Sequence, residues 1–199
     1  MPSTPHTRGS RERPSAALRR RRRAAAGPGF TLVELLIALA IASLVAALAV
    51  PPWRSQLAAA ELRERAGALA EALARARSEA IKRGTRFDLC PSTDRSTCAA
   101  SGEWESGWLT FANEAAREPQ GPVSAVVTRE PGARDGITIR GNTPVARYVS
   151  YTSLGHARRH DGALQMGSFT VCRRGAGALK VVLANSGRTR IDVTNEACP

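Results

Sequence analysis

The chain has 199 residues, enough for one globular domain of ordinary size with an appended segment, which excludes a multidomain enzyme. Its formal net charge is +12, and the positive charge is concentrated at the two ends. The first 29 residues hold eight cations against one acid, and the residues from Arg140 onward hold nine cations against three acids. The part in between is close to neutral.

The first 50 residues predict a leader followed by a membrane segment. Residues 1–29 are Pro, Ser, Ala and Arg without apolar periodicity, so we expect a disordered basic leader outside the fold. Residues 30–50 hold a single ionisable side chain, Glu34, and a helix of this length spans the roughly 30 Å of bilayer hydrocarbon. The run Arg19–Arg23 before it places the N-terminus in the cytoplasm and the rest outside.

Residues 51–84 predict an amphipathic continuation of the helix. Pro51 and Pro52 each remove a helical N–H, so we expect a kink or local unwinding there. Apolar residues then recur every three to five positions from Trp53 to Ala80, with charged residues between them. Gly84 is a candidate C-cap.

Residues 85–199 predict a β-rich domain outside the membrane. Short β-type runs alternate with turn residues such as Gly and Asn. The expected strands are 86–90, 108–111, 123–128, 137–140, 147–151, 169–172, 179–183 and 188–193. The fold class is therefore α+β, with one long N-terminal helix on an antiparallel β domain.

Four cysteines, all in the β-rich part, suit two disulfides in an oxidising compartment better than a metal site, because paired C-x-x-C spacing is missing. Three connectivities are possible. We favour Cys90–Cys98, which closes a short polar loop, and Cys172–Cys198, which ties the C-terminal tail to a central strand.

The segment around Gly29 resembles the class III leader of type IV prepilins and pseudopilins. Gly29 stands directly before the apolar run, and Phe30 is the first residue of that run. An acid, Glu34, is the fifth residue counted from Phe30. The resemblance implies that a prepilin peptidase cuts between Gly29 and Phe30 and methylates the new amino group. The implied partners are this peptidase, other pilins or pseudopilins, and the inner membrane before assembly.

Glu34 needs a partner if it lies deep in the membrane, where a carboxylate costs about 2.5 to 3.5 kcal/mol. The amino group of Phe30 on a neighbouring subunit is such a partner, whereas a position at the headgroup boundary would need none. An ordinary secretory signal cut after Ala47-Leu48-Ala49 is an alternative that would release a soluble protein starting at Val50.

The remainder is similar to the GspH/FimT pseudopilins and minor pilins. The resemblance rests on 76–84, 89–92, Cys98, Trp104, 107–111 and 185–190. It implies a long helix with two facing β-sheets. One branch of this family serves type II secretion; the other serves type IV pili, where a Gly-Arg-x-Arg segment is linked to DNA binding and uptake. Gly187-Arg188-Thr189-Arg190 matches that segment.

A strand through this segment places Arg188 and Arg190 on one face, with Thr189, Ile191 and Val193 anchored on the other. Such a pair of guanidinium groups suits the phosphates of double-stranded DNA and reads no sequence. The wider predicted cluster adds Arg173, Arg174, Lys180, Arg158 and Arg159. The alternative is a solvated basic face without a ligand.

Other signals are weaker. His156 and His160 have the spacing of a helical metal pair, but the glycines and arginines around them favour a loop, so we expect neither a metal nor a cofactor. Trp104 and Trp108 could stack on bases, although core packing explains them better. No nucleophile with a suitable base stands out, so an enzyme is not expected.

The leading hypothesis is a FimT-like minor type IV pilin that binds extracellular double-stranded DNA for uptake in natural transformation. The alternatives are a GspH-like pseudopilin of a type II secretion system and a soluble periplasmic binding module.

Overall fold

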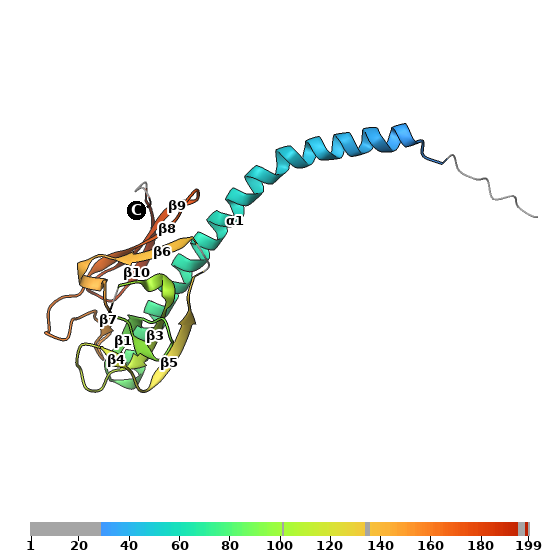
Figure 1. The fold of residues 1–199 in the computed structure, drawn as a ribbon. Coiled ribbons are helices and arrows are strands. Elements are labelled where there is room, and N and C mark those ends of the chain that lie inside the picture. Colours follow the sequence, from blue (N-terminus) through green and yellow to red (C-terminus); the bar gives the residue numbers. More distant parts are fainter. Residues whose placement is uncertain (1–28, 101, 134–135, 195–197, 199) are drawn as a thin grey trace, which may run out of the picture. The chain divides into compact units, whose positions relative to one another are not determined.

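The computed structural model describes residues 29–100, 102–133, 136–194 and 198 (Figure 1). The chain divides into two units, with the boundary between Val45 and Ala46. Almost all of the expected leader, residues 1–28, lies outside the described residues. One helix, α1 (Leu32–Arg83), begins in the first unit and ends in the second.

The described part of the first unit is the start of α1. Thr31 caps the helix, because its Oγ1 accepts a hydrogen bond from the Glu34 N–H at 3.2 Å. The apolar side chains that follow are exposed, from 83% for Phe30 to 55% for Ile37. Among the described residues, no helix has both the length and the apolar character needed to cross a bilayer.

In the second unit α1 buries one face. The helix runs through Pro51 and Pro52 without a break, so local unwinding, one of the two outcomes expected there, does not occur. Leu62, Ala66, Leu69, Leu73, Ala76 and Ala80 recur at three- to four-residue spacing and are buried. The helix ends as expected, because Gly84 follows Arg83 with φ +64°, the left-handed conformation of a C-cap glycine.

Two four-stranded antiparallel sheets follow α1 (Figure 1). The first has the order β5-β3-β1-β7 and comprises β1 (Phe87–Pro91), β3 (Gly107–Ala112), β5 (Val126–Pro131) and β7 (Val149–Tyr151). The second has the order β10-β9-β8-β6 and comprises β6 (Ile137–Gly141), β8 (Gly167–Arg173), β9 (Gly177–Leu183) and β10 (Thr189–Thr194).

Shorter elements connect the sheets. The 3₁₀ turns η1 (Trp104–Ser106) and η2 (Thr143–Val145) lie in the connections, and β2 (Thr97–Cys98) pairs with β4 (Gly121–Pro122). Neither of these short strands is predicted from the sequence. The strand expected at 123–128 starts three residues later, at Val126, because Ala125 has φ +53° and interrupts the extended backbone.

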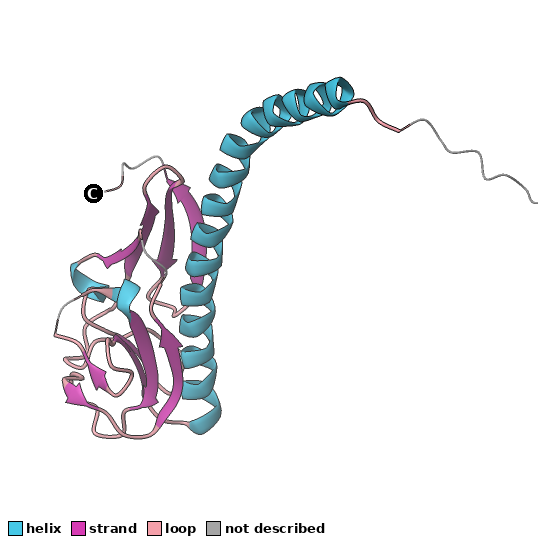
Figure 2. Cartoon of the chain, turned by 45° about the vertical axis from the view of Figure 1, so that its right-hand side comes forward, coloured by secondary structure: helices cyan, strands magenta, loops and turns pink. Residues whose placement is uncertain are grey.

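The C-terminal half of α1 runs along both sheets (Figure 2). One core cluster joins Leu69 and Leu73 of the helix to side chains of both sheets, among them Phe87, Ile139 and Phe169. The α+β class is therefore confirmed. Trp104 and Trp108 belong to this core and are 0% and 1% exposed, so they have the packing role and cannot stack on a ligand.

The structure contains both favoured disulfides, Cys90–Cys98 and Cys172–Cys198. The first closes a loop in which Asp94 accepts hydrogen bonds from the N–H groups of Ser96 and Thr97, and these bonds hold the pKa of Asp94 well below its usual value. The second connects β8 to the C-terminal residues beyond β10.

Candidate nucleic-acid interface and assembly segment

The predicted Gly-Arg-x-Arg segment lies at the turn of a β-hairpin. We call β9, β10 and the turn between them, residues 177–194, the basic hairpin. The Gly187 N–H donates to the Ala184 carbonyl at 2.9 Å, and the Ala184 N–H donates to the Arg188 carbonyl at 2.9 Å. Gly187 has φ +80°, the left-handed position of a three-residue hairpin loop. The turn therefore needs a glycine at position 187, because the backbone there is in the left-handed conformation.

The turn is also held from outside the hairpin. The side chain of Arg77 on α1 donates through Nε to the Gly155 carbonyl at 2.9 Å, and the Ala157 N–H donates to the Asn185 carbonyl at 3.1 Å. A Cβ atom on Gly187 would meet the Gly155 carbonyl oxygen and the Arg77 side chain. The helix, the 152–165 loop and the turn therefore pack together without room for a side chain at Gly187.

Arg188 and Arg190 are both exposed, and strand alternation places them on the same face. Arg190 Nε donates to the carboxylate of Asp192 at 2.9 Å, two residues along the same face. Within the described part of the chain, no hydrogen bond or ion pair of the Arg188 side chain is found. This face therefore presents one unpaired guanidinium group beside one that is ion-paired.

The prediction that the side chains opposite the arginines are anchored in the core is wrong for Ile191 and Val193. Ile191 is 44% exposed and Val193 84% exposed. β10 lies at one edge of its sheet, and the core that covers the inward side chains of β8 and β9 does not extend over these two residues. Neighbouring inward residues on β9, such as Val181, are fully buried.

The wider cluster is brought together only in part. Lys180 lies directly opposite Asp192 in the β9/β10 register and therefore shares the face of Arg190. Arg173 is on the other face, where it forms an ion pair with Glu61 of α1. It thus fastens the helix to the sheet, so its assignment to the cluster is wrong. Arg174 is exposed beside it, at the end of the hairpin away from Arg188.

Arg158 and Arg159 lie in the 152–165 loop. Arg159 pairs with Asp161 at 3.3 Å, and Arg158 donates to the Gly162 carbonyl at 3.5 Å. The loop contacts the hairpin turn through the Ala157–Asn185 hydrogen bond, so Arg158 is close to the turn along the backbone. The local acid and carbonyl partners of both side chains weaken them as phosphate ligands.

The structure adds a groove that sequence reasoning missed. A hollow of about 750 Å³ lies over β8, β9 and β10, lined by Met166, Val182, Lys180, Arg190 and Asp192 among others. Its members come from strands and turns that meet only through the sheet register. The exposed Met166, 48% accessible, is the one lining residue whose type could have signalled an uncovered surface.

His160 is not part of a metal pair. It is 8% exposed, and its Nε2 lies 2.8 Å from Oδ2 of the fully buried Asp88. Asn113 donates to the same carboxylate oxygen, and the Tyr148 ring contacts the imidazole at 5.3 Å between centroids. Burial raises the pKa of Tyr148. Within the described residues no group of three His, Cys, Asp or Glu side chains could hold a metal.

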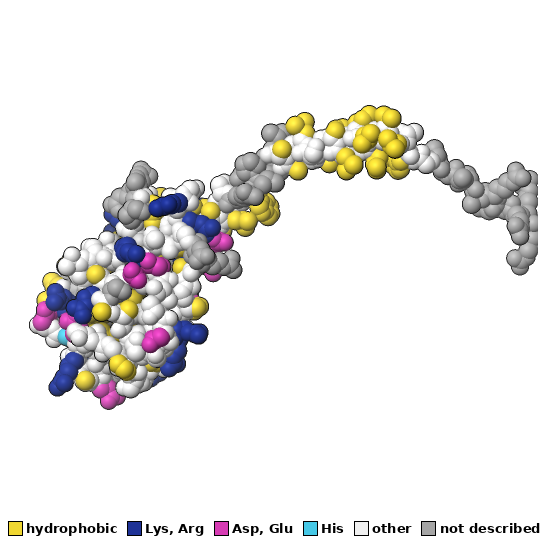
Figure 3. All heavy atoms as spheres, in the orientation of Figure 1, with side chains coloured by type: hydrophobic (Ala, Val, Ile, Leu, Met, Phe, Trp, Pro, Cys, Tyr) yellow, Lys and Arg dark blue, Asp and Glu magenta, His cyan; other side chains and the backbone are white. Residues whose placement is uncertain are grey.

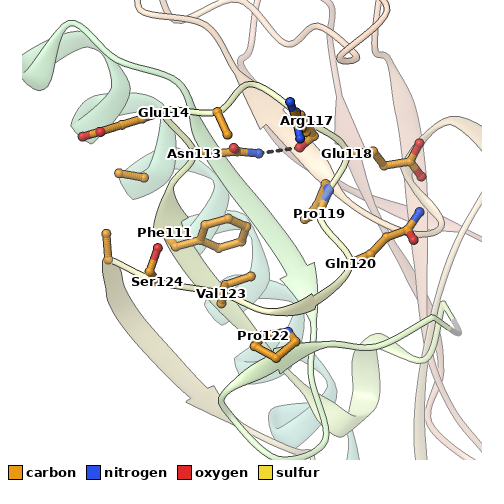
Figure 4. Close-up of a pocket in the computed structure, with 13 residues that line it drawn as sticks. Phe111, Asn113, Glu114, Arg117, Glu118, Pro119, Gln120, Pro122, Val123 and Ser124 are labelled. Atoms are coloured by element: carbon orange, nitrogen blue, oxygen red, sulfur yellow. Dashed lines mark hydrogen bonds between the residues drawn. The ribbon is translucent and has the colours of Figure 1, made fainter.

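Asn113 also begins a loop that surrounds a second hollow of about 610 Å³. Figure 4 shows Phe111 and Val123 inside this loop, with Glu114 and Glu118 pointing away from them. Asn113 donates to the Arg117 carbonyl at 2.6 Å and so closes the loop on itself. The rim carries charges of both signs and favours no ligand of one sign.

The assembly segment predicted from the sequence is exposed at its described positions. Gly29 and Phe30 precede the helix, and Glu34 lies in its first turn. Glu34 is the third residue after the capping Thr31, the position at which an acid favours a helix N-terminus. Figure 3 shows hydrophobic side chains over the visible face of this helical segment.

Comparison with known families decides the identity. Residues 28–50 match the prokaryotic N-terminal methylation motif, and residues 65–187, more than half of the chain, match the family described as type II transport protein GspH. The chain belongs to the GspH family. The methylation motif thus precedes the GspH-family region in the same chain.

Two solved structures resemble this chain. The type IV minor pilin FimU of Pseudomonas aeruginosa is 20% identical, covers 67% of this chain and 88% of its own, and has a TM-score of 0.51, which shows a shared fold. The minor pseudopilin EpsH from the type 2 secretion system of Vibrio cholerae is 15% identical over 68% of this chain and 99% of its own, with a TM-score of 0.46. No curated protein matches the chain.

Proposed function

We propose that this GspH-family chain is a minor pilin of FimT type that enters a type IV filament through its N-terminal helix. The observation that carries the proposal is the exposed apolar surface of residues 30–45, directly after the Gly29–Phe30 junction and inside the methylation motif. A surface of this kind is stable in water only when lipid or neighbouring helices cover it. A prepilin peptidase would cut after Gly29 and methylate Phe30.

Before assembly, residues 30–50 would hold the chain in the inner membrane with the basic leader in the cytoplasm. The 21-residue length, the single ionisable side chain and the arginines at 19–23 support this single-pass topology. The two disulfides fit an oxidising periplasmic location for the β domain.

Within the filament, the carboxylate of Glu34 would pair with the amino group of Phe30 on a neighbouring subunit. The capping geometry uses only the Glu34 N–H, so the carboxylate is available for such a pair. Inside a bundle of apolar helices the Glu34 carboxylate needs this partner, because an unpaired charge in an apolar environment costs free energy.

The test of assembly is the variant Glu34→Gln, which keeps the size and removes the charge. We expect it to reach the membrane fraction normally and to be depleted from sheared filaments. The matched control is Glu71→Gln, on an exposed face of the same helix, which loses only a surface pair with Arg75. Equal incorporation of Glu34→Gln and wild type would contradict the pairing.

DNA binding is the second proposed function, and a specific observation favours it. The unpaired Arg188 side chain lies on the same face as Arg190 and Lys180, at the exposed edge of the second sheet. Among the described residues of this face, Asp192 pairs with Arg190 through Nε, and the Arg188 guanidinium adds positive charge beside this pair. Cations of this kind bind the phosphates of double-stranded DNA without reading its sequence, and the binding weakens with salt.

The test uses the full chain in detergent with a labelled duplex at low salt. Arg188→Ala with Arg190→Ala should weaken binding and reduce the slope of log K against log salt by about 2, if each arginine holds one phosphate. Arg75→Ala with Lys82→Ala removes the same charge from exposed positions of α1 and should change the slope far less. Equal slopes for the two pairs would contradict a localised site.

A GspH-like pseudopilin of a type II secretion system is the alternative within the same family. Genes for secretion rather than pilus components beside this one, together with absent DNA binding, would favour it. A soluble periplasmic module released at Val50 is the third possibility, and the methylation motif argues against it.

A further inference from the structure

The groove over β8, β9 and β10 combines an apolar floor with a charged rim. Val182 and Met166 supply the apolar surface, while Arg190 and Lys180 line the same groove with positive charge. Asn142 lines the same groove, and its Oδ1 accepts from the Ser168 N–H at 3.2 Å, so its amide is a polar group at the rim. The hollow of about 750 Å³ therefore suits an anionic ligand that also has an apolar, hydrogen-bonding body.

We propose that the groove binds single-stranded DNA, with one unpaired base on the apolar floor and the adjoining phosphates on Arg188 and Arg190. This inference rests on the proposed DNA role of the basic hairpin and specifies its substrate. The positive charges of Arg188 and Arg190 complement the negative phosphates of the DNA backbone, and the hollow has room for a base.

The position of Asp192 decides which part of the nucleotide enters. Its carboxylate lines the groove and is ion-paired with Nε of Arg190. A phosphate inside the groove would meet this carboxylate, whereas a base would meet an acceptor for its amino group. Because Asp192 occupies only Nε, the terminal amino groups of Arg190 remain available to a phosphate at the rim.

A duplex cannot use the floor in this way. Its bases are stacked and paired, so it presents phosphates and base edges to a protein surface and would leave Val182 and Met166 exposed to water. A single strand can turn one base out of the stack, which is the usual route to base recognition in single strands. The thioether of Met166 is polarizable and contacts aromatic rings favourably.

The test measures the anisotropy of a labelled 12-nucleotide single strand of mixed sequence and of its blunt duplex, with the full chain in detergent at low salt. Wild type should bind the single strand more tightly than the duplex. Val182→Ala and Met166→Ala should each weaken single-strand binding about fivefold, with less than a twofold effect on the duplex, because each removes apolar surface and changes no charge. The matched control is Val127→Ala, which makes the same truncation at an exposed position of β5 in the other sheet.

Met166→Ala changes an exposed side chain, so it keeps the test valid should Val182→Ala fold poorly. Equal loss for both forms of DNA, or no loss in either variant, would overturn the groove proposal while the DNA role stands. Binding of neither form at low salt would overturn both proposals.

Discussion

Replacing Gly187 by alanine tests how the basic hairpin is held. At φ +80° an alanine costs about 1 to 2 kcal/mol. The added Cβ also meets the Gly155 carbonyl oxygen, which is backbone and cannot rotate away, and such overpacking costs about 1 to 3 kcal/mol. We therefore expect Gly187→Ala to lower the free energy of unfolding by about 2 to 5 kcal/mol.

Gly175→Ala is a matched control at the other end of β9. Gly175 has the same φ of +80°, but nothing lies within 4 Å of its Cβ position. Gly175→Ala should therefore lower the free energy of unfolding only by the cost of the backbone conformation, about 1 to 2 kcal/mol. Urea unfolding of the chain in detergent, followed by the fluorescence of the buried Trp104 and Trp108, measures the difference. Equal losses would show that the turn does not pack on Gly155 as described.

Two further predictions concern the supports of the same region. Arg77→Met keeps the apolar stem but loses the half-buried hydrogen bond to the Gly155 carbonyl. We therefore expect the free energy of unfolding to fall by about 1 to 3 kcal/mol in the same urea assay. An unchanged midpoint would refute a stabilising role for this hydrogen bond. Replacing Cys172 and Cys198 by serine should cost about 3.5 kcal/mol, against about 2.6 kcal/mol for Cys90 and Cys98, because the sequence separations are 26 and 8; the reverse order would contradict the loop-closure reasoning.

Much of the fold follows from local sequence signals. The apolar stripe of α1 and the Gly84 cap depend on helical spacing alone, and most strands show as short β-type runs between turn residues. The predicted start of β5 is three residues too early because Ala125, a residue type that gives no turn signal, adopts a positive φ. The short β2/β4 pair depends on contacts between distant segments, which a single sequence does not reveal.

The candidate site was only partly predictable for the same reason. Alternation along one strand places Arg188 and Arg190 together, and the register places Lys180 beside them. Alternation along β8 places Arg173 on the face of the buried Phe169 and Val171, which a local signal could have indicated, whereas its ion pair with Glu61 joins positions some 110 residues apart. The exposure of Ile191 and Val193 depends on how far the core extends over β10, which has no local signal in the sequence.

The central claim is that this chain is a processed filament subunit, and the mature N-terminus tests it most directly. Mass spectrometry of the protein extracted from membranes of its own host should find a chain that begins with N-methylated Phe30. A chain that begins at Val50 would show release by a signal peptidase, and one that keeps residues 1–29 would show that the prepilin peptidase does not act on it. Either result would contradict assembly through Phe30 and Glu34.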